Sequence, residues 1–92
     1  MTDTVMDNET TNTSETYSPK VRSTESRDGL IQILFAGTAG TITVEGSLDG
    51  TNFTQMYQVV DTSDLREVRL PPFMRFTTSS MSTAIVSVLV NN

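Results

Sequence analysis

The chain has 92 residues, enough for one small domain, and it contains neither cysteine nor histidine. Disulfide bonds and the usual zinc sites are therefore excluded, and a serine nucleophile lacks its usual histidine base. Eleven acidic residues against six basic ones give a formal net charge of −5, which argues against a nucleic-acid-binding surface.

The sequence also lacks the signals of membrane insertion and secretion. Its longest apolar run is far shorter than the roughly 20 residues that a membrane-spanning helix needs. No basic segment followed by an apolar core stands at the start of the chain. We therefore expect no membrane partner, and nothing in the sequence calls for a cofactor or a metal.

The first segment, MTDTVMDNETTNTSET, is acidic and has few apolar residues. Residues 1–16 carry four carboxylates and no Lys or Arg. Such a segment buries too little surface to offset its ordering entropy. We therefore predict a flexible N-terminal arm over residues 1–16, followed by a folded domain over 17–92. If the arm binds a partner, its contacts are expected from Val5 and Met6, and from Tyr17 at its end.

From Tyr17 onward, apolar and polar residues alternate, which is typical of strands with one buried face. The clearest case is GTITVEGSLDGTNF, where Ile42, Val44, Gly46 and Leu48 fall on one side. The pair Asp-Gly then favours a tight hairpin turn. Expected strands cover residues 17–24, 29–37, 41–48, 53–60, 68–72, 73–79 and 83–90.

No segment has apolar residues at helical spacing, apart from one short helical turn that residues 61–67 could form. The sequence therefore predicts an all-β fold of about seven short strands, either a small antiparallel sandwich or a partly open barrel. The final strand, TAIVSVLV, is apolar on both faces, with Ile85 and Leu89 opposite the valines. A strand of this kind needs cover on its second face, from another subunit or from the arm.

Few residues offer a chemical site. The turn Asp49-Gly50-Thr51-Asn52 contains one carboxylate, too few for calcium, and is interpreted as a chain reversal. Asp61 and Asp64 could form a carboxylate pair, but solvated loop charges are the commoner case. Arg69 and Arg75 flank the Pro-Pro-Phe turn and could pair with carboxylates of a neighbouring subunit, or within the chain with Glu45 or Glu67. We predict no enzymatic activity.

Residues 28–92 resemble the small β-sandwich structural proteins of tailed bacteriophages. The resemblance lies in GTITVEGSLDGTNF, in VRLPPFMRFTT and in the terminal TAIVSVLV strand. It matches Gly46, Asp49, Gly50, Pro71 and Arg75 to structural positions and implies no catalytic role. The polar arm lies outside it.

The resemblance implies a virion protein made in the host cytoplasm, and the leading hypothesis is a capsid decoration (cement) protein. Its partner would be the major capsid protein, and its N-terminal arm would bridge neighbouring capsid subunits. Self-association, for instance as a trimer, is also expected. Two alternatives remain: a phage tail, neck or head-fibre subunit, and a carbohydrate-binding adhesion module with an aromatic platform around Tyr57.

Overall fold

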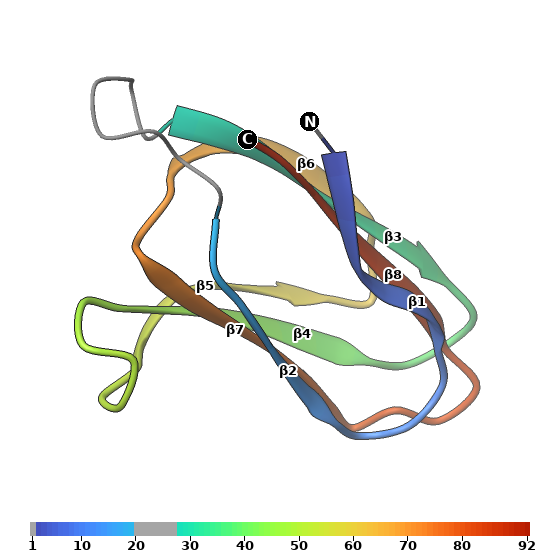
Figure 1. Cartoon of the computed structure of the whole chain (residues 1–92). Coiled ribbons are helices and arrows are strands. Elements are labelled where there is room, and N and C mark those ends of the chain that lie inside the picture. The colour runs from blue at the N-terminus through green and yellow to red at the C-terminus, as the bar shows by residue number, and fades with distance from the viewer. Residues whose placement is uncertain (1, 20–27) are drawn as a thin grey trace.

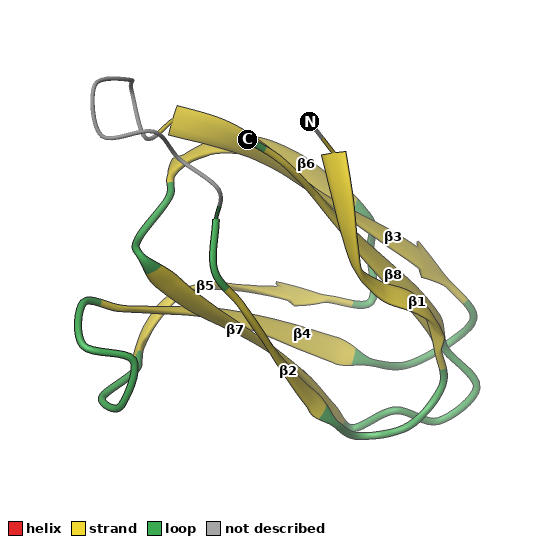
Figure 2. Cartoon of the chain, viewed as in Figure 1, coloured by secondary structure: helices red, strands yellow, loops and turns green. Residues whose placement is uncertain are grey.

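Eight antiparallel strands form two four-stranded sheets that pack face to face in the computed structural model, which describes residues 2–19 and 28–92 (Figures 1 and 2). Sheet A has the strand order β1-β8-β3-β6, and sheet B has the order β2-β7-β4-β5. No helix occurs among the described residues, so the predicted all-β sandwich is confirmed. The strands are β1 (Thr2–Glu9), β2 (Ser14–Tyr17), β3 (Asp28–Ala36), β4 (Thr41–Ser47), β5 (Thr54–Val60), β6 (Asp64–Arg69), β7 (Phe73–Ser79) and β8 (Ile85–Asn91).

The chain passes back and forth between the two sheets. Among the described strands, β4 and β5 are the one consecutive pair that lies in a single sheet. Every other step along the chain moves from sheet A to sheet B or back. Strands that pair are therefore mostly distant in sequence, and β1 lies antiparallel to β8, beside the end of the chain.

The core lies between the sheets and is built from the inward face of each strand. In sheet A, Ile31 pairs with Val90 and Ile33 with Val88, and all four side chains are fully buried. In sheet B, Val44 pairs with Phe76, which is among the largest of the fully buried side chains. β-branched and aromatic residues suit such half-buried pleated surfaces, and this accounts for the alternation in the sequence.

The extended N-terminal arm is not confirmed, because residues 2–9 form β1 at the edge of sheet A and residues 14–17 form β2 at the edge of sheet B. The ordering comes from partners far along the chain: β8 pairs with β1, and β7 pairs with β2. Met6 is only 3% exposed in the core, while Val5 and Tyr17 pack partly buried against it. These three side chains, expected to reach a partner, contact the chain's own interior.

Polar contacts fasten this N-terminal segment to the end of the chain. The Tyr17 hydroxyl donates to Asp3 Oδ2 at 2.6 Å, and Asn92 Nδ2 donates to the Tyr17 oxygen at 2.7 Å. Burial and the Asp3 carboxylate together raise the pKa of Tyr17. Between β1 and β2, the backbone oxygen of Thr11 accepts a hydrogen bond from the Thr78 hydroxyl at 2.6 Å. The hydroxyl of Thr78, which is buried, therefore has a hydrogen-bond partner.

Three other expectations need correction or qualification. Residues 61–67 were expected as a connection with a short helical turn, but β6 begins at Asp64, where it pairs with Ile33 of β3. Leu48 was expected on the buried face, yet β4 ends at Ser47 and Leu48 is 84% exposed in the turn. Of the first expected strand, 17–24, residues 18 and 19 form no strand, and 20–24 lie outside the described residues.

Candidate functional site

The outer face of sheet A carries an apolar patch that no described part of the chain covers. Alternation along β3 and β8 points Ile31 and Val88 inward, so their neighbours along each strand point outward. Leucine or isoleucine stands at many of these outward positions, and β6 adds Leu65, which is 62% exposed. We call this set the sheet A patch; its members are Leu30, Leu34, Leu65, Ile85 and Leu89.

The register places three members of the sheet A patch close together. Leu65 lies opposite Gln32, which in turn lies opposite Leu89 on the other side of β3. A shallow hollow of about 240 Å³ lies here, with Leu30, Leu65 and Leu89 in its lining. Side chains such as Gln32 provide polar groups at the same surface. Apolar patches with polar neighbours are typical of protein-docking sites.

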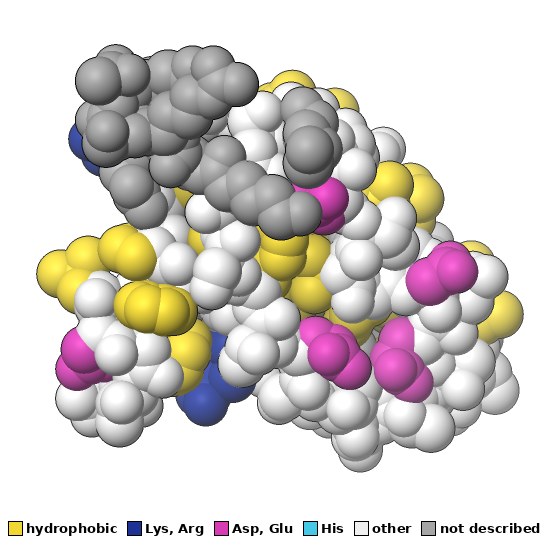
Figure 3. Space-filling view, in the orientation of Figure 1, with side chains coloured by type: hydrophobic (Ala, Val, Ile, Leu, Met, Phe, Trp, Pro, Cys, Tyr) yellow, Lys and Arg dark blue, Asp and Glu magenta, His cyan; other side chains and the backbone are white. Residues whose placement is uncertain are grey.

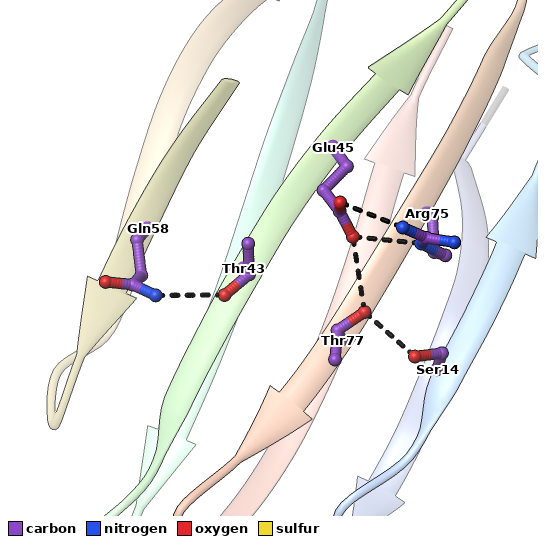
Figure 4. Close-up of polar contacts among 6 residues, drawn as sticks. All are labelled: Ser14, Thr43, Glu45, Gln58, Arg75 and Thr77. Atoms are coloured by element: carbon purple, nitrogen blue, oxygen red, sulfur yellow. Dashed lines mark hydrogen bonds and ion pairs between the residues drawn. The ribbon is translucent and has the colours of Figure 1, made fainter. Parts of the chain in front are cut away.

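The outer face of sheet B is polar by contrast (Figure 4). Gln58 Nε2 donates to Thr43 Oγ1 at 3.0 Å, and the hydroxyls of Ser14 and Thr77 lie 2.9 Å apart. These side chains satisfy one another across the strands. The two outer faces therefore differ in kind, and the apolar one is sheet A.

Arg75 forms its ion pair within the chain. Its Nε donates to Glu45 Oε1 at 2.9 Å and its Nη2 to Glu45 Oε2 at 3.0 Å, across the β4–β7 pair (Figure 4). The guanidinium also lies 4.4 Å from the centre of the Phe53 ring. Hydrogen bonding to Arg75 lowers the pKa of Glu45. Of the two pairings considered for Arg75, the intrachain one with Glu45 is observed.

Arg69 behaves differently. It is the last residue of β6 and lies opposite Asp28 in the β3–β6 register, and its side chain is exposed. It makes no ion pair with any residue that the structure describes, whereas Arg66 pairs with Asp64 at 2.8 Å. Its contact with a neighbouring subunit thus stays a prediction.

The Asp49 turn is held by its own hydrogen bonds. Asp49 Oδ1 accepts the backbone N–H groups of Thr51 and Asn52, both at 2.8 Å, and Oδ2 accepts from Asn52 Nδ2 at 2.8 Å. These donors, with the Ser47 hydroxyl, hold the pKa of Asp49 well below its usual range. Gly50 has a φ of +79°, which a glycine adopts without strain. These hydrogen bonds and the conformation of Gly50 account for the residues Asp49, Gly50 and Asn52 in a turn that reverses the chain.

Replacing Asp49 by asparagine should lower the melting temperature at pH 7, because the charged acceptor is lost. The folded-state pKa of this carboxyl is depressed. Its contribution is therefore present above the unfolded value of about 3.9 and is lost as the pH falls toward the folded value. The difference in melting temperature between wild type and Asp49→Asn should shrink below about pH 4. Thermal unfolding followed by circular dichroism at pH 7, 5 and 3 measures it.

Asp7→Asn is the matched control, since Asp7 is exposed on β1 and accepts no side-chain hydrogen bond from a described residue. A pH-independent difference for Asp49→Asn, parallel to that of Asp7→Asn, would contradict the role given to the Asp49 carboxylate.

The two carboxylates that could form a pair, and the Tyr57 ring, make contacts within the chain. Asp61 Oδ1 accepts from the Gly40 N–H at 2.8 Å, and Asp64 pairs with Arg66, so these two carboxylates serve separate contacts. Tyr57 packs partly buried against the core with Arg66 3.9 Å from its ring centre, and burial raises its pKa to about 12. Arg66 thus covers one face of the Tyr57 ring, and the carbohydrate-binding alternative stays a prediction.

The described residues form neither a metal-binding cluster nor a membrane-spanning helix. They contain no group of three or more His, Cys, Asp or Glu side chains placed to hold a metal ion. Within the same part of the chain, no helix is long and apolar enough to cross a membrane.

Sequence reasoning found part of the sheet A patch and missed the rest. The two-sided apolar character of the last strand drew attention to Ile85 and Leu89. Leu65 could not be found from the sequence, because the two apolar residues of DLREVR, Leu65 and Val68, fall on opposite faces of β6 and show no alternation. Comparison of the chain with protein-family models, curated proteins and solved structures gave no match.

Proposed function

We propose that this chain is a non-enzymatic structural protein that attaches to a larger protein assembly through the sheet A patch. Four large apolar side chains of this patch, Leu30, Leu34, Leu65 and Ile85, are each more than 40% exposed. A small domain that leaves so many such residues on one face is stabilised when a partner covers them. This patch is the observation that carries the proposal.

The assembly that we propose is a bacteriophage capsid, with the chain as a decoration protein on its outer surface. The resemblance of residues 28–92 to phage structural proteins supports this choice. The partner is then the major capsid protein. Residues 2–9 and 14–17 are strands of the sandwich, which supports our placing the attachment on a sheet face instead of on an N-terminal arm.

Cosedimentation with empty capsids that lack this protein tests the proposal. Wild-type protein should bind saturably, and the double variant Leu34→Lys/Leu65→Lys should bind about a hundredfold more weakly or worse. Each buried leucine contributes about 1.5–3 kcal/mol, and about 1.4 kcal/mol is a factor of ten in affinity. Both side chains are exposed in the free chain, so the variant should fold.

Val60→Lys is the matched control, since Val60 is a 53% exposed apolar residue of the other sheet. Equal binding by wild type and the double variant would refute attachment through the sheet A patch. Assembly of the protein into rings or fibres, with no capsid binding, would instead indicate a tail, neck or head-fibre subunit.

A further inference from the structure

A second apolar surface lies at the end of the sandwich and shares no lining residue with the sheet A patch. There a groove of about 640 Å³ runs between the β4–β5 turn and the connection from β6 to β7. Figure 3 shows hydrophobic side chains gathered at the end of the molecule that carries the β4–β5 turn. We call it the end groove; its lining includes Leu48, Met56, Arg69, Leu70, Pro71 and Pro72.

Gly46 allows the walls of the end groove to come close together. A Cβ atom at this position would lie 2.8 Å from Pro71 Cγ and 2.9 Å from Met56 Sδ. Neither separation leaves room for a side chain. The glycine therefore lets a residue of the β6–β7 connection and a residue of β5 meet over the end of β4.

One wall of the end groove presents a large, exposed apolar side chain. Leu48 is 84% exposed, the highest value among the exposed large hydrophobic residues of the described chain. The turn that carries it is held firmly, because Ser47 Oγ accepts the N–H of Gly50 at 2.9 Å and Asp49 accepts those of its neighbours. Because the backbone of the turn is held in this way, it loses little further freedom when Leu48 docks.

The end groove also has two charges of opposite sign. Asp49 lies next to Leu48 on one wall, and Arg69 lies on the other, without an ion pair to a described residue. The occupant that suits this groove has an aliphatic side chain beside a carboxylate. The Leu48-Asp49 turn of a second copy of the chain has this chemistry.

We propose that two copies of this chain associate through their end grooves about a two-fold axis. Leu48 of each copy enters the groove of the other, and Asp49 of each copy lies beside Arg69 of the other. A surface that holds a projection next to its own complementary groove is self-complementary, as a two-fold interface requires. The inference does not rest on the proposed function, since it uses a different surface.

The neighbouring edge strand is compatible with this approach. Thr54, Gln55 and Met56, which start β5, also line the end groove. Among the four edge strands of the described sandwich, β1, β2 and β6 contain charged residues, whereas β5 (TQMYQVV) contains none. Two copies that meet here thus bring no like charges of β5 together.

Sedimentation velocity of the full chain over a wide concentration range tests the proposal. Wild-type protein should show a concentration-dependent species of twice the monomer mass. Leu48→Lys should remain monomeric with an unchanged circular dichroism spectrum, because the side chain is almost fully exposed in the monomer. Arg69→Glu should also weaken the dimer, more strongly at low salt, because it sets a carboxylate against Asp49 of the other copy.

Leu65→Lys, an apolar-to-lysine change in the sheet A patch, is the control and should leave the dimer intact. Wild-type protein that stays monomeric up to about 1 mM, a range that includes weak transient interfaces, would overturn the proposal. So would a dimer that withstands Leu48→Lys, or one that Leu65→Lys dissociates equally well. Loss of capsid binding with the end-groove dimer intact would leave this inference standing.

Discussion

A chain that lacks residues 1–17 should fail to fold, although the composition of this segment is typical of a flexible polar arm. β1 covers the outer edge of β8, and β2 covers the outer edge of β7. Without β1 and β2, the outer edges of β8 and β7 are exposed to solvent, and the backbone N–H and C=O groups along these edges lose their partners. Circular dichroism and amide hydrogen exchange of the truncated chain should show a largely unfolded protein.

A point substitution gives the same test without deletion. Met6 is buried in the core, so Met6→Ala should lower the free energy of unfolding by about 2–5 kcal/mol. The control is Thr4, which is exposed two residues earlier in β1. Thr4→Ala should change the free energy of unfolding by no more than about 0.5 kcal/mol. A truncated chain that unfolds at the wild-type urea midpoint would show that β1 is not part of the stable fold.

Phe76→Ala should be the most damaging single truncation in the core. Phe76 is fully buried between the sheets, and removal of a buried phenylalanine ring costs about 3–5 kcal/mol. Small domains have only about 5–15 kcal/mol of net stability, so this variant should be partly unfolded at 37 °C. Urea unfolding followed by circular dichroism gives the free energy directly.

Phe73, three residues earlier in the same strand, is the matched control. It is 37% exposed and contacts the β4–β5 turn near Gly50. Phe73→Ala should therefore cost about 1 kcal/mol, because less of its ring is removed from water. Equal shifts of the urea midpoint for the two variants would contradict the assignment of Phe76 to the centre of the core.

Local patterns predicted the parts of the fold that are decided locally. Alternation located β4, and the Asp-Gly pair located the hairpin turn between β4 and β5. β1 could not be found in this way, because its sequence TDTVMDNE has two apolar residues and its stability comes from β8. Tertiary pairing overrode a composition that is typical of disorder.

The two candidate arginines show the same limit for the surface sites. Both flank the Pro-Pro-Phe turn, yet Arg75 is paired with Glu45 whereas Arg69 lines the end groove. Spacing along the chain could not separate these roles, because Glu45 lies 30 residues from Arg75 in the sequence. The end groove combines two chain segments, the β4–β5 hairpin and the β6–β7 connection, and its main sequence signals were an apolar residue beside the Asp-Gly turn and the paired prolines.

The repeated passage of the chain from sheet A to sheet B has a consequence for the rate of folding. Apart from the β4–β5 hairpin, each strand pairs with a strand that is distant in the sequence, and β1 can pair only after β8 has formed. Folds with such non-local pairings fold in milliseconds to seconds, far more slowly than helical domains of the same size. During synthesis, β1 and β2 emerge from the ribosome long before β8 and β7. We therefore expect the nascent chain to depend on chaperones or fast completion to escape aggregation.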